Sequence, residues 1–250
     1  MTLPASFTAR PFAHRALHDL ADGRPENSRE ATRAAIEAGY GIEIDLQLSS
    51  DGVPMVFHDY DLGRLTGQTG PVAQRSAKDL SAITLTGGQT GIPTFGDILD
   101  LVAGRVPLLV EFKDQDGLMG PNVGRLEQAA ARLIAAYDGP VAVMSFNPHS
   151  VAALAEALPD TPRGIVSESY SESSTPTLPA SVRDRLRQIG EYDRVGATFI
   201  SHEAEDLGRP RVAELKRQGA TILCWTIRSP QAETEARKVA DQVTFEGYLA

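Results

Sequence analysis

Short β-rich runs alternate with helical stretches along nearly the whole chain of 250 residues, and this alternation constrains the fold more than any other feature. Parallel strands need long crossover connections, which helices usually supply, so the pattern predicts an α/β protein with a parallel sheet covered by helices. The predicted strands are 12–14, 41–46, 53–58, 108–113, 141–146, 164–167, 197–201, 221–226 and 242–245. The predicted helices are 26–38, 95–102, 123–137, 148–157, 209–218 and 231–238, with a shorter one at 76–83 and with Thr94 and Asn147 as expected N-caps.

One junction is too short to hold a crossover helix. The runs 41–46 and 53–58 are separated by a few residues ending in Asp51-Gly52, which suits a hairpin turn, so 53–58 is predicted to be an antiparallel extra strand. A turn centred near residues 50 and 51 would place Glu43 opposite His58, to within a residue or two. Eight strands remain, which is the number in a closed (β/α)8 TIM barrel, a fold of about 250 residues.

The chain shows no internal repeat and no linker, so residues 1–250 are predicted to form a single domain. Residues 59–92 are polar and rich in Gly and Thr, and they are expected to form a small insertion over one rim of the barrel. Residues 167–179 follow a strand end, so this loop should lie at the same mouth.

Composition excludes several classes of protein. A single cysteine, Cys224, excludes a disulfide-stapled domain, and its apolar strand context predicts an inert buried thiol. The 24 Lys and Arg against 33 Asp and Glu give a net charge of −9, which argues against binding nucleic acid or anionic lipid through a general basic surface. No targeting pattern and no long apolar run are visible, so we expect a cytoplasmic protein without stable membrane association.

Charged side chains interrupt two of the predicted strands. Glu43 and Asp45 are two residues apart and therefore share one face of their strand, and Glu111 and Lys113 do the same in another strand. Because an unpaired buried carboxylate is costly, three carboxylates that converge at strand ends need a cation. Oxygen ligands alone favour a hard ion, Mg²⁺ or Ca²⁺. The alternatives are that these strands are exposed edges, or that Lys113 simply pairs with one acid.

Two histidines close predicted strands, His14 before Arg15 and His58 before Asp59. Imidazole titrates near neutral pH, so histidines beside a cation suggest a general acid and a general base, although a lone histidine is more often structural. The fork of donors on Arg15 suits a phosphate or a carboxylate.

The sequence leaves the role of three other polar or aromatic residues open. Asn27 or Ser28 could be no more than an N-cap of the first helix. Trp225, at the end of a late strand, could stack on a substrate or belong to the core.

These motifs, taken in order, resemble the glycerophosphodiester phosphodiesterase family. The matching pieces are Ala13-His14-Arg15, Pro25-Glu26-Asn27-Ser28, Glu43-Ile44-Asp45, Asp51-Gly52, Val56-Phe57-His58-Asp59, the stretch 62–67, Ile92-Pro93-Thr94, Glu111-Phe112-Lys113, Ser145-Phe146 and Trp225-Thr226. The resemblance covers nearly the whole chain and is densest over residues 13–113.

The resemblance implies a TIM barrel with a small insertion that hydrolyses glycerophosphodiesters to glycerol phosphate and an alcohol with the help of one divalent cation. The family's metal ligands match Glu43, Asp45 and Glu111, and its acid/base pair matches His14 and His58. Its phosphate-contacting residues match Arg15 and Lys113. Its aromatic residue near the alcohol matches Trp225, with Phe146 close by.

The sequence departs from the family pattern at two places. Ala16 stands where a glycine usually follows His-Arg, and its methyl group could crowd the backbone beside the phosphate. The last strand ends in Thr244-Phe245-Glu246-Gly247 instead of Thr-Asp-Xaa-Pro, and no role is assigned to Glu246.

The remaining polar residues receive plain interpretations. His18 is expected to be a solvated loop residue and His149 a surface residue, whereas Glu168 and His202 follow strand ends and are candidates for lining the mouth.

Two other functions stay open at this point. One is a lipid phosphodiesterase of the same barrel type, a lysophospholipase D or a phospholipase C relative, and the other is a barrel that binds a phosphorylated ligand without catalysis. The identity of the alcohol and the oligomeric state cannot be deduced from the sequence.

Overall fold

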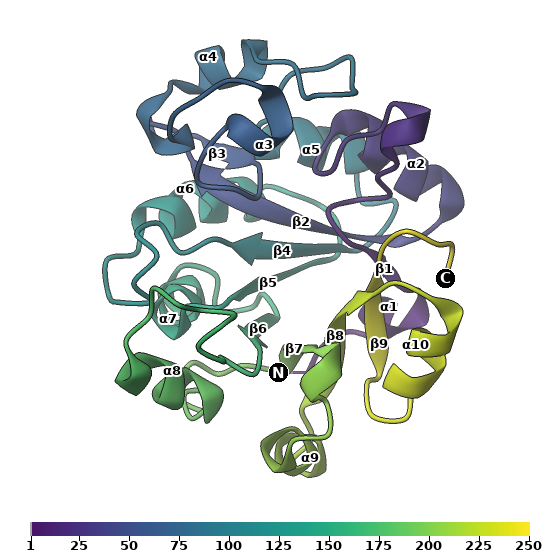
Figure 1. Ribbon diagram of the computed structural model, residues 1–250, viewed down its shortest axis with the longest axis vertical. Coiled ribbons are helices and arrows are strands. Elements are labelled where there is room, and N and C mark those ends of the chain that lie inside the picture. The colour runs from purple at the N-terminus through teal and green to yellow at the C-terminus, as the bar shows by residue number, and fades with distance from the viewer. Residues whose placement is uncertain (1) are drawn as a thin grey trace.

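The computed structural model describes residues 2–250 as a closed parallel barrel surrounded by helices (Figure 1). The sheet has nine strands in the order β1-β9-β8-β7-β6-β5-β4-β2-β3, and it closes through a parallel pairing of β1 with β2. Only β3 lies outside the ring, so the prediction of a (β/α)8 barrel with one extra hairpin strand is confirmed. The strands are β1 Phe12–Ala13, β2 Gly41–Leu48, β3 Pro54–Val56, β4 Leu108–Phe112, β5 Val141–Ser145, β6 Arg163–Ser167, β7 Phe199–Glu203, β8 Thr221–Ile227 and β9 Gln242–Phe245.

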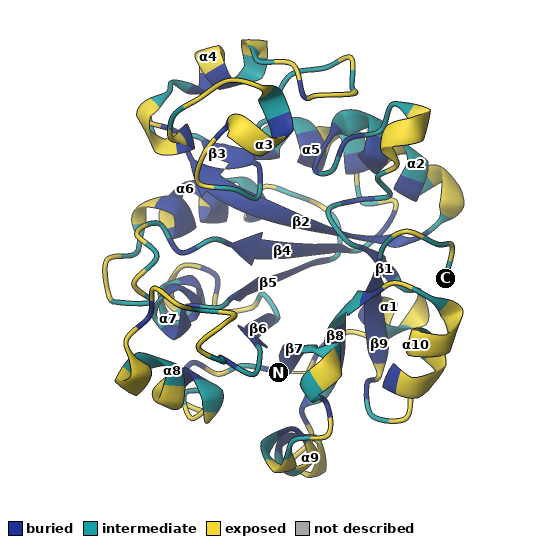
Figure 2. Ribbon diagram, viewed as in Figure 1, coloured by how far each residue is buried: buried dark blue, intermediate teal, exposed yellow. Residues whose placement is uncertain are grey.

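Helices cover the outer face of the barrel, whereas its strands are almost entirely buried (Figure 2). They are α1 Ser6–Ala9, α2 Arg29–Ala38, α3 Gly63–Thr66, α4 Ala77–Ala82, α5 Phe95–Val102, α6 Arg125–Ile134, α7 Pro148–Ala157, α8 Ala180–Arg187, α9 Pro210–Arg217 and α10 Pro230–Ala236, with short 3-10 turns at Leu20–Asp22, Val72–Gln74 and Ala204–Asp206. The sequence did not predict α8, because Leu186 is its only buried residue and it shows no apolar stripe. The four-residue helices α1 and α3 are too short for a periodic pattern.

The helix starts follow from side-chain caps. Thr94 accepts a hydrogen bond from the Asp97 backbone in a capping box, and Asn147 accepts one from the His149 backbone, so both expected N-caps are confirmed. Helix α2 begins at Arg29, later than predicted, because the Ser28 side chain caps it and the preceding residues turn towards the barrel mouth.

Each strand of the barrel separates two apolar layers. Residues of one parity, such as Ile42, Ile44 and Val110, pack against the surrounding helices. Residues of the other parity fill the barrel interior together with Phe7 of α1: Phe12, Leu109, Ala142, Met144, Val166, Phe199 and Leu223. Burial on both faces explains the nearly continuous apolar sequence of the strands.

Two phenylalanine rings close the floor of the barrel, and each lies over a glycine. A Cβ atom at Gly41 would lie 2.7 Å from the Phe12 ring, and one at Gly164 would lie 2.2 Å from the Phe199 ring. The Phe7 ring stacks beneath Phe12 with centroids 5.9 Å apart. The glycines are therefore required for steric reasons, because the rings occupy the space that a side chain would take.

The hairpin after β2 has a register one residue away from the predicted one. Leu46 pairs with Val56 and Leu48 with Pro54, so continuation of the ladder would place residue 44, not Glu43, opposite His58. The cause lies in the turn: the Ser49 N–H donates to the Val53 carbonyl at 3.0 Å, which centres the turn on residue 51.

The insertion 59–92 packs around its own apolar cluster beside β3, separate from the two barrel layers (Figure 1). The members of this cluster are Met55, Phe57, Leu62, Leu65, Val72, Ala77, Leu80, Leu85 and Ile92. Among residues 2–250, no helix has both the length and the apolar character needed to cross a membrane.

The floor packing makes a prediction about stability. Gly164→Ala should lower the free energy of unfolding by about 1–3 kcal/mol, because its methyl group must displace the Phe199 ring in a closed interior. Urea unfolding followed by circular dichroism measures this change. Gly208→Ala is the matched control, because a Cβ atom there has no neighbour within 4 Å. Adding Phe199→Leu to Gly164→Ala should recover part of the loss, and equal stability of the two glycine variants would contradict the packing.

Candidate active site

The inward-facing residues of the strands continue beyond the apolar interior into a cavity at the C-terminal ends of the strands. This cavity has a volume of about 410 Å³. Every residue of the predicted metal, acid/base and substrate-binding sets lines it: His14, Arg15, Glu43, Asp45, His58, Glu111, Lys113, Phe146 and Trp225. Parity explains the convergence, because Phe12 and His14, or Leu109 and Glu111, are alternate residues along one strand direction.

Three carboxylates form a buried triad at one side of this cavity. Glu43 and Asp45 lie on β2 and Glu111 on β4, where Asp45 and Glu111 are register partners. One oxygen from each lies within 4.8 Å of the others, and all three residues are buried. Burial, followed by the charges of Asp45 and Glu111, raises the pKa of Glu43 well above its usual range. The donor set consists only of oxygen atoms, and it fits a hard divalent cation that would offset this repulsion.

Two basic side chains approach the triad from either side. The Lys113 Nζ atom lies 2.7 Å from Glu111 Oε1 and 3.5 Å from Asp45 Oδ1, and Arg15 Nε lies 3.7 Å from Asp45 Oδ2. Burial lowers the pKa of Lys113, but Glu111 and Asp45 outweigh it and raise that pKa overall. Lys113 thus does pair with acids of the triad, as the simpler alternative supposed, yet Lys113 and Arg15 together supply only two positive charges beside three carboxylates.

Asp45 stays ionised within the triad. Burial alone would raise its pKa, but the charges of His58, Lys113 and Arg15 hold it below its usual range. The Asn27 amide also donates to Asp45 Oδ2 at 2.9 Å. The sequence suggested only a capping role for Asn27, and the structure instead assigns the helix cap to Ser28.

His14 is held by a carboxylate that is itself held by an arginine. Its Nδ1 atom lies 2.5 Å from Glu246 Oε2, and Arg228 Nε donates to Glu246 Oε1 at 2.7 Å. The sequence assigned no role to Glu246, although the parity of Gln242 and Thr244 along β9 would have placed it in the mouth. His18 is not a freely solvated loop residue, because its Nε2 atom lies 3.6 Å from the same carboxylate.

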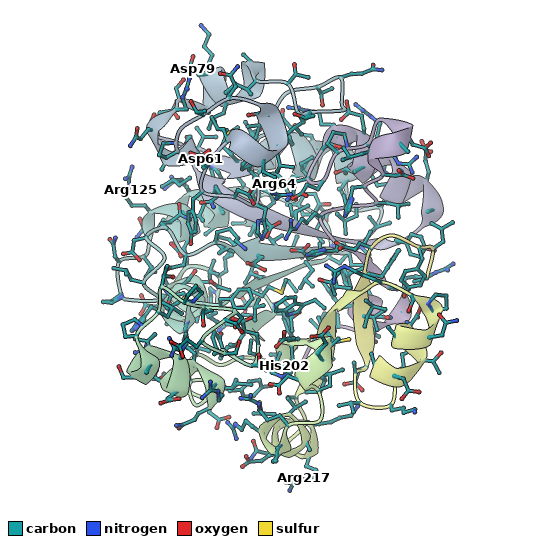
Figure 3. All side chains as sticks on the ribbon, viewed as in Figure 1. Asp61, Arg64, Asp79, Arg125, His202 and Arg217 are labelled. Atoms are coloured by element: carbon teal, nitrogen blue, oxygen red, sulfur yellow. The ribbon has the colours of Figure 1, made fainter. Side chains whose placement is uncertain are left out.

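His58 has the same arrangement on the opposite side. Its Nδ1 atom lies 2.7 Å from Asp59 Oδ1, and Arg64 contacts both Asp59 oxygens at 2.7 and 2.8 Å. Arg64, on the insertion (Figure 3), also donates to both oxygens of Glu26, which in turn accepts from Arg15 at 2.7 Å. A carboxylate on Nδ1 favours the tautomer with hydrogen on that atom, which leaves Nε2 as the free ring nitrogen of each histidine.

The loop after β1 adopts a left-handed backbone conformation at three residues. The φ angles are 53° at Arg15, 65° at Ala16 and 55° at Asn27. The backbone N–H groups of Arg15 and Ala16 both donate to Glu43, at 2.9 Å to its side chain and at 3.0 Å to its carbonyl oxygen. A glycine would adopt this conformation freely, whereas the Cβ atom of Ala16 costs about 1–2 kcal/mol. Ala16 is buried and does not line the cavity, so its methyl group does not crowd the site directly.

Two aromatic side chains form one wall of the cavity. Trp225 packs edge-on against Phe146 with ring centroids 5.6 Å apart, and its Nε1 atom donates to the Ser201 carbonyl at 3.0 Å. Both rings also pack against the barrel interior, so Trp225 belongs to the core and to the cavity wall at once.

The remaining candidate residues lie either in the wall of the cavity or in the protein interior. Glu168 lines the cavity, as the sequence allowed. His202 does not: it is fully buried beside β8 (Figure 3), where it contacts Ser167 at 2.8 Å and Asp206 at 3.2 Å. Cys224 is buried as expected, and burial raises the pKa of its thiol to about 12, so it stays protonated.

Comparison with known proteins identifies the relatives of this chain. The sequence profile of the glycerophosphoryl diester phosphodiesterase family matches residues 14–245. The protein YhdW of Bacillus subtilis (strain 168) is 24% identical over 245 residues, which cover 93% of each chain. A phosphodiesterase of Oleispira antarctica, in complex with its product sn-glycerol-3-phosphate, has a TM-score of 0.76 at 21% identity and covers 96% of this chain and 94% of its own.

A glycerophosphodiester phosphodiesterase of Parabacteroides distasonis shows the same barrel, with a TM-score of 0.71 at 22% identity over 95% of this chain and 94% of its own. These structural likenesses establish the fold, and the profile match extends from the first histidine of the site to the end of β9. The chain therefore belongs to the glycerophosphoryl diester phosphodiesterase family.

Proposed function

We propose that the protein hydrolyses glycerophosphodiesters to glycerol phosphate and an alcohol, with one divalent cation and two histidines acting as acid and base. The observation that carries this proposal is the convergence of His14 and His58 on the cavity that holds the carboxylate triad. Family membership supports it, and so does the product found in the Oleispira antarctica relative.

The residues that would hold the cation are Glu43, Asp45 and Glu111, and either Mg²⁺ or Ca²⁺ suits their oxygen atoms. When bound, the cation supplies positive charge against the negative charge that develops on the phosphoryl oxygens. The protein adds its own positive charge nearby, because Arg15 and Lys113 line the same cavity and can donate to non-bridging oxygens.

Acid/base work falls to the free Nε2 atoms of the two histidines. Attack by water gives glycerol phosphate directly, whereas attack by the neighbouring glycerol hydroxyl gives a cyclic phosphate that water opens in a second step. In either case one imidazole accepts a proton from the nucleophile as a new P–O bond forms. The other, as an imidazolium, gives a proton to the oxygen of the departing alcohol as its P–O bond breaks. Glu246 and Asp59 keep the Nδ1 protons in place and stabilise the imidazolium form of their partners. A protein that only binds a phosphate would not need two histidines held in this way.

The acid/base assignment is tested by removing each imidazole. His14→Ala and His58→Ala should each lower kcat by about 10²–10⁴-fold, which is the usual contribution of a positioned acid or base. Release of alcohol from glycerophosphodiesters measures the rate, and circular dichroism checks folding. His149→Ala, on α7 away from the cavity, is the control. Rates near wild type for both cavity variants would refute the assignment.

The cation site predicts opposite effects of one substitution on the two forms of the protein. Glu43→Gln removes one of three repelling charges, so Tm without a cation should stay equal or rise. Excess Mg²⁺ or Ca²⁺ should raise the Tm of the wild type, since binding at 100 times Kd stabilises by about 2.7 kcal/mol, and this shift should disappear in Glu43→Gln. Glu37→Gln, at an exposed carboxylate of α2, is the control. A cation-dependent shift that survives Glu43→Gln would place the cation elsewhere.

The pairing of His14 with Glu246 predicts a change in pKa. Burial lowers the pKa of His14 below its usual value of 6.5, and the hydrogen bond and charge of Glu246 oppose this shift. Glu246→Gln should therefore lower the pKa of His14 further, because the neutral amide no longer stabilises the imidazolium form by its charge. Imidazole NMR signals of the cation-free protein give the value directly. An unchanged pKa would show that this pair does not form, and Glu205→Gln serves as the distant control.

A further inference from the structure

A separate cavity, of about 450 Å³, is lined by the loop after β1 and by the segment after β9 (Figure 1). His18 and Glu246 line this cavity, whereas His14 lines the catalytic cavity and contacts Glu246 from that side. The pair of His14 and Glu246 therefore connects the two cavities. Two imidazoles and one carboxylate meet at this point, and the proposed hydrolysis does not use His18.

The backbone brings these three side chains together. His14 follows β1 and Glu246 follows the neighbouring strand β9, where the His14 N–H donates to the Phe245 carbonyl at 2.9 Å. The His18 N–H donates to the Ala16 carbonyl at 2.9 Å, within the loop of left-handed backbone. His18 therefore approaches the same carboxylate as His14, although the two histidines are four residues apart in the sequence.

One nitrogen atom of this cluster has no hydrogen-bond partner among residues 2–250. The His18 Nε2 atom is buried and lies 3.6 Å from Glu246 Oε2, which is too long for a hydrogen bond. His14 Nδ1 lies 2.5 Å from the same oxygen. One ligand atom from each of the three residues lies within 4.8 Å of the others. A buried polar atom without a partner costs free energy, and an ion bound at this point would remove that cost.

We propose that His14, His18 and Glu246 form a second metal site, that this site takes Zn²⁺, and that zinc bound there inhibits the enzyme. The donor set is two nitrogen atoms and one oxygen atom, which suits zinc, whereas the oxygen atoms of the carboxylate triad suit Mg²⁺ or Ca²⁺. The inhibition rests on the proposed catalytic role of His14, but the metal site itself does not.

The geometry that zinc requires is close to the observed one. Ligand atoms about 2.0–2.1 Å from a tetrahedral zinc ion lie about 3.3 Å from one another. The distance of 3.6 Å between His18 and Glu246 is near this value, and the distance of 2.5 Å between His14 and Glu246 must increase by less than about 1 Å. Arg228 donates to the other oxygen of Glu246 at 2.7 Å and can keep the ligating carboxylate oriented. Water from the cavity beside His18 can occupy the fourth position.

Zinc inactivates His14 by changing its tautomer. Without zinc, Glu246 holds the hydrogen on His14 Nδ1, and Nε2 is free for acid/base work. When Nδ1 binds the ion, its N–H bond breaks and that proton goes to water, while Nε2 takes a proton from water, because a neutral imidazole carries one N–H hydrogen. Nε2 then has no lone pair to accept a proton. Its N–H is also a much weaker acid than an imidazolium, so His14 can serve neither as base nor as acid.

The activity test is run in excess Mg²⁺ or Ca²⁺, so that the carboxylate triad is filled. Zn²⁺ from a zinc buffer should lower the kcat of the wild type about a hundredfold, which is the scale of losing an acid or base. His18→Gln should keep the basal rate, because His18 does not line the catalytic cavity, and it should need about tenfold more Zn²⁺ for half inhibition. His149→Gln, on α7, is the matched control and should be inhibited like the wild type. Equal inhibition of all three proteins would overturn the proposal.

Binding is measured separately from activity. In the Glu43→Gln protein, where the carboxylate triad is impaired, competition with a chromophoric chelator should show one Zn²⁺ bound per chain. Adding His18→Gln should weaken this binding about tenfold. In the wild type, the imidazole NMR signals of His14 and His18 should both shift as Zn²⁺ is added, while those of His58 and His202 should not. An unchanged His18 signal would refute the site.

The metal site and the proposed function can fail separately. Zinc binding that depends on His18, in a protein that hydrolyses no diester, would refute the proposed function and support the metal site. Hydrolysis that zinc inhibits equally in His18→Gln and the wild type would support the function and refute the site. Zinc that binds through His18 and leaves the rate of hydrolysis unchanged would refute the inhibition.

Discussion

The mutual repulsion of three buried carboxylates is the constraint to which the rest of the barrel mouth responds. Parallel pairing of β2 with β4 brings Asp45 and Glu111 to the same level, and the parity of β2 adds Glu43. Lys113, the Arg15 side chain and backbone, and the Asn27 amide all direct positive charge or hydrogen-bond donors at this triad. The left-handed backbone of the loop after β1 follows from the same need, because it turns two successive N–H groups towards Glu43.

Ion pairs extend outward from the triad and connect it to the insertion. From Arg15 the contacts pass to Glu26, then to Arg64, then to Asp59 and the ring of His58. The insertion therefore holds a catalytic candidate through an exposed arginine, while its own apolar cluster holds its shape. His14 receives its support from the other end of the chain, through Glu246 and Arg228. Two segments distant in sequence thus use the same combination of imidazole, carboxylate and guanidinium.

Much of the site could be predicted, because the alternation of side chains along each strand determines which residues face the barrel interior. Glu43 and Asp45, or Glu111 and Lys113, share a face in any extended strand, so their convergence needs only a closed parallel sheet. Glu246 lies just beyond β9 and shows no motif of its own, although the parity of that strand points to it. Asn27 was less predictable, because its contact with Asp45 depends on a left-handed turn that favours no single residue type strongly enough.

Other features depend on tertiary detail that a local pattern does not contain. The hairpin register differs by one residue from the predicted one because the Ser49 N–H donates to the Val53 carbonyl. The local sequence does not determine which residues pair across the turn. Helix α8 buries only Leu186, so its sequence resembles a solvated loop. The glycine-over-phenylalanine contacts at the floor arise from neighbours that are 29 and 35 residues apart along the chain.

The phenylalanine floor also decides how molecules can move through the protein. Phe12 and Phe199 are completely buried and, with Phe7 beneath, they seal the barrel at the end opposite the carboxylate triad. Among residues 2–250, the cavity is therefore closed at the floor of the barrel and opens at the rim of loops around its mouth. Substrate must enter, and both products must leave, past the same rim of loops. A product that stays bound would block the next substrate, so the rate of product release past this rim affects turnover.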